Sequence, residues 1–149
     1  MRTNILRFIF LSVCWLPFIL SAQTTGEFTS PQKLLKEAQE LFRQENYLAA
    51  VPPAKEYIKL KPQSDYLYEA DYILACAAYE LKDANRLEIL KDYLAKYPDT
   101  PYSNRITALM ASVHFFNENY KKALELFHLS NLELLAGDEL DDMTYRMAI

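Results

Sequence analysis

The sequence predicts an all-α protein in which pairs of antiparallel helices recur along the chain. Only 2 glycines occur among 149 residues, so tight turns are few and the secondary-structure elements must be long. Alanine, leucine, glutamate and lysine are frequent, and these residue types favour helix over strand. A short sequence phrase and a set of alanines recur at one spacing, which indicates an internal repeat.

The segment 1–22 is predicted to form a secretory signal peptide. Arg2 and Arg7 form a positively charged stretch before an apolar run from Phe8 to Leu20, and the segment ends in the small residue Ala22. A membrane-spanning helix needs about 18 or more apolar residues, so a retained anchor is the less favoured alternative. The segment 23–30 is predicted to be a short linker before the repeats.

The net charge of the chain limits the kinds of partner that are expected, and its cysteine content limits how the fold can be held together. Loss of the segment 1–22 would remove two arginines and no acidic residue, which changes the formal net charge from −4 to −6. An acidic, evenly mixed chain does not favour nucleic acid or anionic lipid as a partner. The same cleavage would remove Cys14 and leave Cys76 alone, so no intrachain disulfide would hold the fold.

The repeat is visible as the phrase F-x-x-E-N-Y-x-x-A, which runs from Phe42 to Ala50 and again from Phe115 to Ala123. Ala84 stands at the position of the tyrosine in a weaker middle copy. Pro62 and Pro98, which follow apolar runs, are separated by an interval of 36. Four alanines keep the same phase, at intervals of 37, 36 and 37: Ala38, Ala75, Ala111 and Ala148.

Apolar side chains at intervals of three and four positions predict the individual helices. Each unit contains two such stripes, joined in the first unit by the short polar break 44–46, so the two helices must fold back on one another. The expected helices cover about 34–42 and 47–58, then 68–79 and 87–94, then 106–115 and 120–127. A further helix, in phase through Ala148, is expected over 141–149.

Polar residues and prolines predict where these helices begin and end. Ser30-Pro31, Ser64-Asp65 and Thr100-Pro101 each place a capping residue or a first-turn proline before the first helix of a unit. Pro62 and Pro98 are expected to end the second helices. Pro52-Pro53 lies inside a helical pattern, and it either falls near the first turn or kinks that helix and reshapes the unit.

These positions resemble the tetratricopeptide repeat family. The resemblance rests on a small residue near place 8, an aromatic near 17, alanine at 20, a large apolar residue at 24 and proline at 32 of each unit. The first unit carries Ala38, Tyr47, Ala50, Ala54 and Pro62 there, and the third carries Ala111, Tyr120, Ala123 and Phe127. The second matches at Ala75 and Pro98 but has lost one residue, with Leu87 near the usual alanine.

The resemblance implies a right-handed α-solenoid of about three and a half repeats over 31–149. The units are expected at about 31–67, 68–103 and 104–140, with a partial fourth at 141–149. The stretch KYPDTPYSNRITALM is similar to helix junctions of exported bacterial repeat proteins, so we expect a periplasmic or outer-membrane-associated protein.

In this family the first helix of each unit lines a concave groove that binds peptides. Transfer by register gives Gln32, Leu35, Gln39, Phe42 and Arg43 from the first unit. It gives Glu69, Tyr72, Cys76, Tyr79 and Glu80 from the second unit, and Arg105, Ala108, Ser112, Phe115 and Phe116 from the third. Aromatic side chains among a few polar groups suit a protein or peptide partner. The alternative is that these aromatic residues only pack against the next unit.

No pattern in the sequence predicts catalysis, a cofactor or a metal site. His114 and His128 are too far apart to share one face of a helical turn, and neither has an acidic residue or cysteine at ligand spacing. Cys76 stands between alanines, which is typical of a packed thiol rather than a nucleophile. The acidic residues at 138–142 stand at an expected helix start, where they favour the helix dipole.

The sequence therefore predicts a non-catalytic protein-interaction scaffold of the bacterial cell envelope. The alternative is an amino-terminal docking or oligomerisation module of a larger exported enzyme or sensor. Repeat arrays need an element that covers the last apolar face. Because none follows the helix expected at 141–149, we expect either further repeats beyond it or self-association through that end.

Overall fold

The computed structural model describes residues 30–61, 63–131 and 137–148, and this part of the chain contains seven helices and no strand. The helices are α1 (Pro31–Arg43), α2 (Tyr47–Leu60), α3 (Leu67–Glu80), α4 (Arg86–Lys96), α5 (Ser103–Phe116), α6 (Tyr120–Leu129) and α7 (Gly137–Ala148). The prediction of an all-α fold is confirmed. The predicted signal peptide lies outside the described residues.

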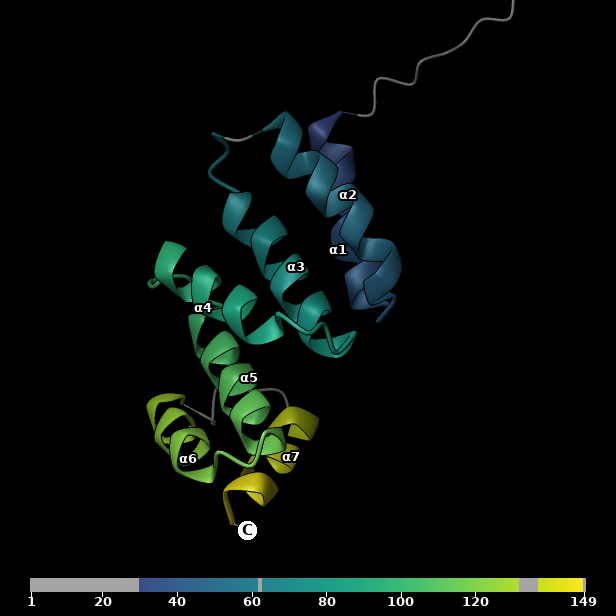
Figure 1. Ribbon diagram of the computed structural model, residues 1–149. Coiled ribbons are helices and arrows are strands. Elements are labelled where there is room, and N and C mark those ends of the chain that lie inside the picture. The colour runs from purple at the N-terminus through teal and green to yellow at the C-terminus, as the bar shows by residue number, and fades with distance from the viewer. Residues whose placement is uncertain (1–29, 62, 132–136, 149) are drawn as a thin grey trace, which may run out of the picture.

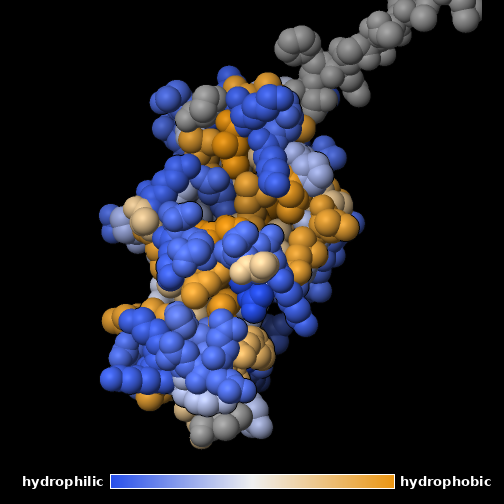
Figure 2. All heavy atoms as spheres, viewed as in Figure 1, coloured by the Kyte–Doolittle hydropathy of each residue, from blue (hydrophilic) through white to orange (hydrophobic). Residues whose placement is uncertain are grey.

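Each helix packs against the next one in the chain, and every odd-numbered helix also packs against the next odd-numbered helix. The molecule is elongated, with α1 and α2 at one end and α6 and α7 at the other (Figure 1). In the space-filling view, hydrophobic residues gather in the upper and middle parts of the visible face, whereas the lower end is mostly hydrophilic (Figure 2). None of the described helices has the length and apolar character needed to cross a bilayer.

The turns after α1, α3 and α5 share one backbone conformation. Glu45, Lys82 and Glu118 have φ values of 58°, 56° and 59°, in the left-handed region that side chains other than glycine rarely adopt. In each turn the next residue's N–H bonds a carbonyl five positions back, as Asn46 does to Leu41 at 2.9 Å. The three left-handed residues are separated by intervals of 37 and 36, so the period in the sequence is also a period in the backbone.

The phased alanines mark where helices approach closely. Ala38 and Ala111 are 0% exposed and Ala75 is 1% exposed, so a larger side chain would force the helices apart. The second helices contribute Ala50 and Ala123 to the same contacts, again with almost no exposure. Ala148, the fourth member of the series, is exposed on α7, so the prediction that it continues the packing pattern fails within the described chain.

The second unit departs from the other two at the start of its second helix. α2 and α6 begin two positions after the left-handed residue, whereas α4 begins four positions after Lys82. The Asp83 carboxylate accepts the N–H of Asn85 at 2.7 Å, and its carbonyl accepts the N–H of Arg86 at 3.2 Å. This local turn competes with the helix, so Ala84 lies in the turn and does not take the place of Tyr47.

Only one of the three predicted helix starts has the expected cap. Ser30 accepts the N–H of Lys33 at 3.4 Å at the start of α1. Ser64 and Thr100 lie outside α3 and α5, and their hydroxyls bond the buried tyrosines of the preceding helices. The Ser64 hydroxyl also accepts the N–H of Tyr66 at 3.2 Å, in the turn before α3. Tyr57 meets Ser64 at 2.6 Å and Tyr93 meets Thr100 at 3.1 Å. A serine or threonine that was expected to cap the next helix thus ties its connection to the preceding helix.

Both prolines of the Pro52-Pro53 pair lie inside α2, well past its first turn. The explanation that they fall near the first turn is therefore wrong. The missing N–H groups would have bonded the carbonyls of Leu48 and Ala49. Leu48 is 72% exposed, so this turn of α2 lies at the surface. Pro53 is buried and adds apolar surface to the core.

The last described helix, α7, starts earlier than expected. α7 begins at Gly137, four positions before the start predicted from the acidic run, and ends at Ala148. It packs on α5 and α6, and Met143 is 3% exposed in that contact. The boundary predicted at position 140 between the third and fourth units therefore falls within a helix.

Candidate functional site

The predicted groove positions lie on the odd-numbered helices, but the structure gives them three different environments. At the α1–α3 contact they line an open groove. At the α3–α5 contact they are closed over by aromatic rings. Near α7 they pack around an arginine.

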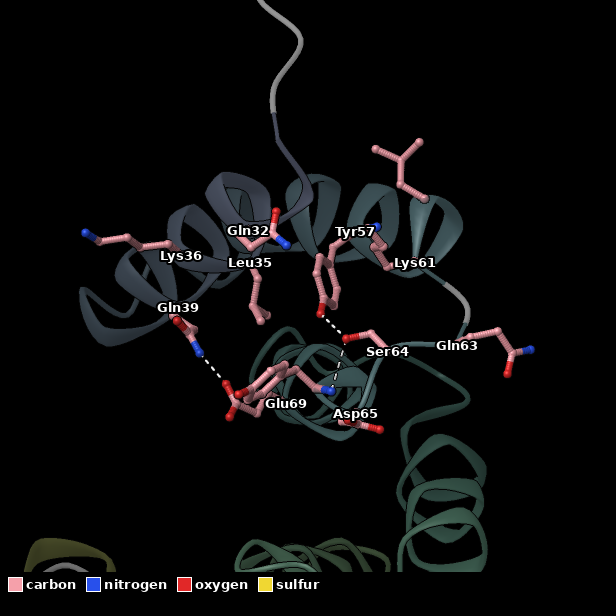
Figure 3. A pocket seen from close by; sticks show the side chains of 12 residues that line it. Gln32, Leu35, Lys36, Gln39, Tyr57, Lys61, Gln63, Ser64, Asp65 and Glu69 are labelled. Atoms are coloured by element: carbon pink, nitrogen blue, oxygen red, sulfur yellow. Dashed lines mark hydrogen bonds between the residues drawn. The ribbon is translucent and has the colours of Figure 1, made fainter.

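The open groove has a volume of about 870 Å³ and lies between α1, the end of α2 and the start of α3 (Figure 3). Leu35 and Tyr57 are 9% and 3% exposed and form its apolar floor. Four positions transferred by register contribute to this one groove: Gln32, Leu35, Gln39 and Glu69. The structure therefore brings together residues from two predicted units.

Gln39 and Glu69 meet across this groove. The amide of Gln39 on α1 donates a hydrogen bond to the carboxylate of Glu69 on α3. The Tyr68 hydroxyl donates to the same carboxylate at 3.2 Å. The side chains of Gln39 and Glu69 are thus held in place. The amide oxygen of Gln39 can still accept a hydrogen bond, because only the amide nitrogen is used in the bond to Glu69. Figure 3 shows the Gln39–Glu69 bond spanning the space beneath Leu35.

Arg43 lies beside this groove and not in it. It is exposed and makes an ion pair with Glu40 of its own helix at 2.7 Å. The hydrogen bond from Arg43 is the main cause that lowers the pKa of the Glu40 carboxyl. Such an exposed pair adds little to stability.

Register transfer missed the groove residues that lie outside the odd-numbered helices. Lys61, Gln63, Ser64, Asp65 and Tyr66 line the groove from the α2–α3 connection. Their contribution could not be found from helix register, because a connection has no fixed register. The available indication was the repeated Tyr57–Ser64 and Tyr93–Thr100 spacing, which places this connection against the preceding helix.

At the α3–α5 contact, Tyr72 fills the space where a groove would continue. Its ring is 6% exposed and stacks on Tyr102 with 3.9 Å between ring centroids and 11° between ring planes. Phe42 packs edge-on against the same ring, with centroids 5.7 Å apart. Arg105 on α5 donates a hydrogen bond to the Tyr72 hydroxyl and lies 5.8 Å from the ring centroid. Burial raises the pKa of Tyr72, so its hydroxyl stays neutral.

The remaining predicted aromatic positions are on the C-terminal parts of α3 and α5. Tyr79 and Phe115 are half-buried and pack on the core, which favours the alternative that these aromatic residues stabilise neighbouring units. Phe116 is 58% exposed, and the guanidinium of Arg146 on α7 lies 4.6 Å from its ring centroid. Arg146 also donates to the Tyr79 hydroxyl at 3.5 Å.

The other positions transferred by register in α3 and α5 include Ser112, Cys76 and Glu80. Ser112 is 0% exposed and its hydroxyl donates to the Ala108 carbonyl at 3.2 Å, so it cannot touch a peptide on the surface. Cys76, a further register position, is 1% exposed. Glu80 is exposed at the end of α3, and its charge adds to the effect of burial in raising the pKa of Tyr47 on α2.

Within the described ranges, no group of three or more His, Cys, Asp or Glu residues is arranged to hold a metal ion. His114 is half-buried, and burial is the main cause that lowers its pKa, followed by Lys91 and Lys122. Comparison of the chain with protein-family models, with curated proteins and with solved structures finds no match in any of the three.

Proposed function

We propose that this chain is a non-catalytic protein-interaction scaffold, a right-handed tetratricopeptide-like α-solenoid exported to the bacterial cell envelope. The observation that carries the proposal is the open groove between α1 and α3, in which amide, carboxylate and ammonium groups surround an apolar floor. Such a surface suits recognition of an extended peptide.

The repeated backbone supports the solenoid part of the proposal. The same left-handed turn follows α1, α3 and α5 at intervals of 37 and 36. Contacts of each odd-numbered helix with the next helix and with the next odd-numbered helix are those expected when antiparallel pairs stack in one direction. Stacked pairs are rigid, so little ordering cost arises when a partner binds.

Three glutamine side chains provide hydrogen-bond donors and acceptors in the groove. Gln32, Gln39 and Gln63 line it, and each primary amide offers both donors and an acceptor. A peptide backbone presents the complementary groups at every residue. We infer that these amides hold the backbone of an extended peptide, while Leu35 and Tyr57 receive one of its apolar side chains.

Charge divides the two walls of the groove. Lys36 and Lys61 lie on the α1–α2 side, whereas Asp65 and Glu69 lie on the α3 side (Figure 3). A bound peptide with an acidic and a basic side chain on opposite edges would match this division, and one orientation of the strand would be favoured.

Site-specific crosslinking in cells tests the proposal. A photoreactive residue at Gln39 should form a covalent adduct with a partner protein, and the same residue at Lys55, which is exposed on α2 outside the groove, should not. Equal adducts at both positions would show that the groove has no special role. Turnover of a substrate by the purified chain would contradict the non-catalytic assignment.

Export is tested separately. The N-terminus of the protein recovered from the cell envelope is expected at Gln23, after removal of the segment 1–22. Recovery of the uncleaved chain from the cytoplasm would contradict the exported location and would leave the peptide groove unaffected.

A further inference from the structure

The carboxylate of Glu69 differs from the other charged groups that line the open groove. Glu69 is half-buried, whereas Lys36, Lys61 and Asp65 are exposed. Glu69 also lies in the first turn of α3, where the helix dipole favours a negative charge. The groove therefore has a carboxylate on its α3 wall that is partly withdrawn from water.

Two hydrogen bonds orient this carboxylate, and both come from neutral groups. The Gln39 amide donates to one oxygen, and the Tyr68 hydroxyl donates to the other at 3.2 Å. Tyr68 is itself packed against Tyr97 and Tyr102, with ring centroids 6.5 and 5.9 Å from its own. In the described ranges no cationic side chain forms an ion pair with Glu69. The carboxylate is thus held in one orientation without being neutralised.

Glu69 can accept further hydrogen bonds from a ligand. An ionised carboxylate offers about four acceptor sites, and Gln39 and Tyr68 each use one of them. A cationic donor forms a stronger bond with a carboxylate than a neutral donor does. Figure 3 shows Glu69 beneath Leu35, which forms the apolar floor with Tyr57. A ligand that places a cation on Glu69 therefore also meets an apolar surface.

The basic residues of the groove lie on its other wall. Lys36 and Lys61 are exposed on the α1–α2 side, and Figure 3 shows the Lys36 side chain extending away from Glu69. Water and salt screen exposed charges more strongly than partly buried ones. The half-buried Glu69 should therefore discriminate between ligand charges more strongly than either lysine.

We propose that Glu69 selects a peptide segment in which a lysine or arginine stands beside an apolar residue. The cationic group binds the Glu69 carboxylate, and the apolar residue packs on Leu35 and Tyr57. The hydrocarbon stem of a lysine or arginine is also suited to lie along an apolar floor. This inference rests on the peptide-binding function proposed above and adds the chemical class of the peptide.

Selection of random peptides displayed on phage, with the purified protein immobilised, tests the inference. The selected peptides should share a lysine or arginine next to an apolar residue. Synthetic copies with glutamine in place of the basic residue should bind about fivefold more weakly, because a charge-assisted bond is lost. This preference should shrink at high salt, which screens the charges.

A conservative substitution assigns the preference to Glu69. Glu69→Gln keeps an oxygen that can accept from Gln39 and Tyr68 but removes the charge, so it should bind the basic peptide and its glutamine copy equally. The matched control is Glu37→Gln, which removes the same charge from an exposed position of α1 outside the groove and should keep the preference. Circular dichroism establishes that both variants are folded.

The outcomes separate this inference from the peptide groove itself. Peptides that crosslink to a photoreactive residue at Gln32 but carry no basic residue, or carry acidic ones, would overturn the role of Glu69 and leave the groove standing. A preference that survives in Glu69→Gln would do the same. A library that yields no peptide bound at Gln32 would overturn both.

Discussion

The α1–α3 and α3–α5 contacts place the same register positions in opposite environments. At α1–α3, Leu35 and Gln39 leave an open groove with polar walls. At α3–α5, Tyr72 occupies the place equivalent to Leu35, and its ring is stacked on Tyr102 and bonded by Arg105. Position in the repeat therefore does not decide by itself whether a residue lines an open groove or lies under other side chains.

The largest expected effect comes from removal of the ring that closes the second contact. Tyr72→Ala should lower the free energy of unfolding by about 3–5 kcal/mol, because a buried aromatic side chain is replaced by a cavity and Arg105 loses its hydroxyl partner. Urea denaturation measures the change. Tyr66→Ala removes a ring that is 57% exposed at the open groove, and its effect should stay within about 0.5 kcal/mol. Similar losses for the two variants would contradict the division into core and site.

The two hydrogen bonds that join a buried tyrosine to the connection after its helix, Tyr57–Ser64 and Tyr93–Thr100, provide a second comparison. Tyr57→Phe should cost about 1 kcal/mol, because it removes a 2.6 Å bond to Ser64. Tyr93→Phe should cost less, because Thr100 is also within 3.2 Å of the Ser103 hydroxyl and bonds the Tyr97 carbonyl at 3.3 Å.

A double-mutant cycle with Ser64→Ala isolates the first of these bonds. Thermal or urea unfolding of the four proteins should give a coupling energy of about 1 kcal/mol between Tyr57 and Ser64. A coupling near zero would mean that the hydroxyls exchange their partner for water without loss.

The repeated turns should respond alike even though the surfaces around them differ. Lys82→Gly should raise the free energy of unfolding by roughly 0.5 kcal/mol, since glycine adopts a φ of 56° without steric strain but gains more freedom when unfolded. Glu45→Gly and Glu118→Gly should behave in the same way. The opposite sign is expected for Lys55→Gly in the interior of α2, where glycine costs about 1 kcal/mol relative to a good helix former. Loss of stability on replacement of Lys82 would show that its side chain makes a contact that outweighs the strain.

Much of the backbone could be predicted from the sequence, because its determinants are local and recur. The alanines at 38, 75 and 111 located the close contacts, and the break at 44–46 located a turn whose conformation returns after α3 and α5. The start of α4 could not be predicted from the period, because Asp83 closes a local turn there: its carboxylate accepts the N–H of Asn85 and its carbonyl accepts the N–H of Arg86.

Whether the face of the odd-numbered helices is open or closed by aromatic rings depends on residues distant in sequence. Whether Tyr72 faces solvent is decided by Tyr102, which follows the whole of α4, and by Arg105 on the next odd-numbered helix. Ser64 and Thr100 were expected to cap helices because a hydroxyl before a helix often does so. In the structure Ser64 and Thr100 form hydrogen bonds with Tyr57 and Tyr93, and helix periodicity does not reveal those contacts.

The smallest expected effect on stability is also the most direct test of the open groove. Gln39→Ala removes an exposed amide whose partner, Glu69, keeps the hydrogen bond from Tyr68, so the free energy of unfolding should change by less than about 0.5 kcal/mol. Adducts with the partner, measured from a photoreactive residue at Gln32 in the same groove, should nevertheless fall several-fold, because the peptide backbone loses one amide contact. Glu37→Ala changes an exposed residue of the same helix outside the groove and should alter neither quantity. If Gln39→Ala left the adducts unchanged while Tyr72→Ala abolished them without unfolding the protein, the binding face would lie at the α3–α5 contact, and the open groove would have no part in recognition.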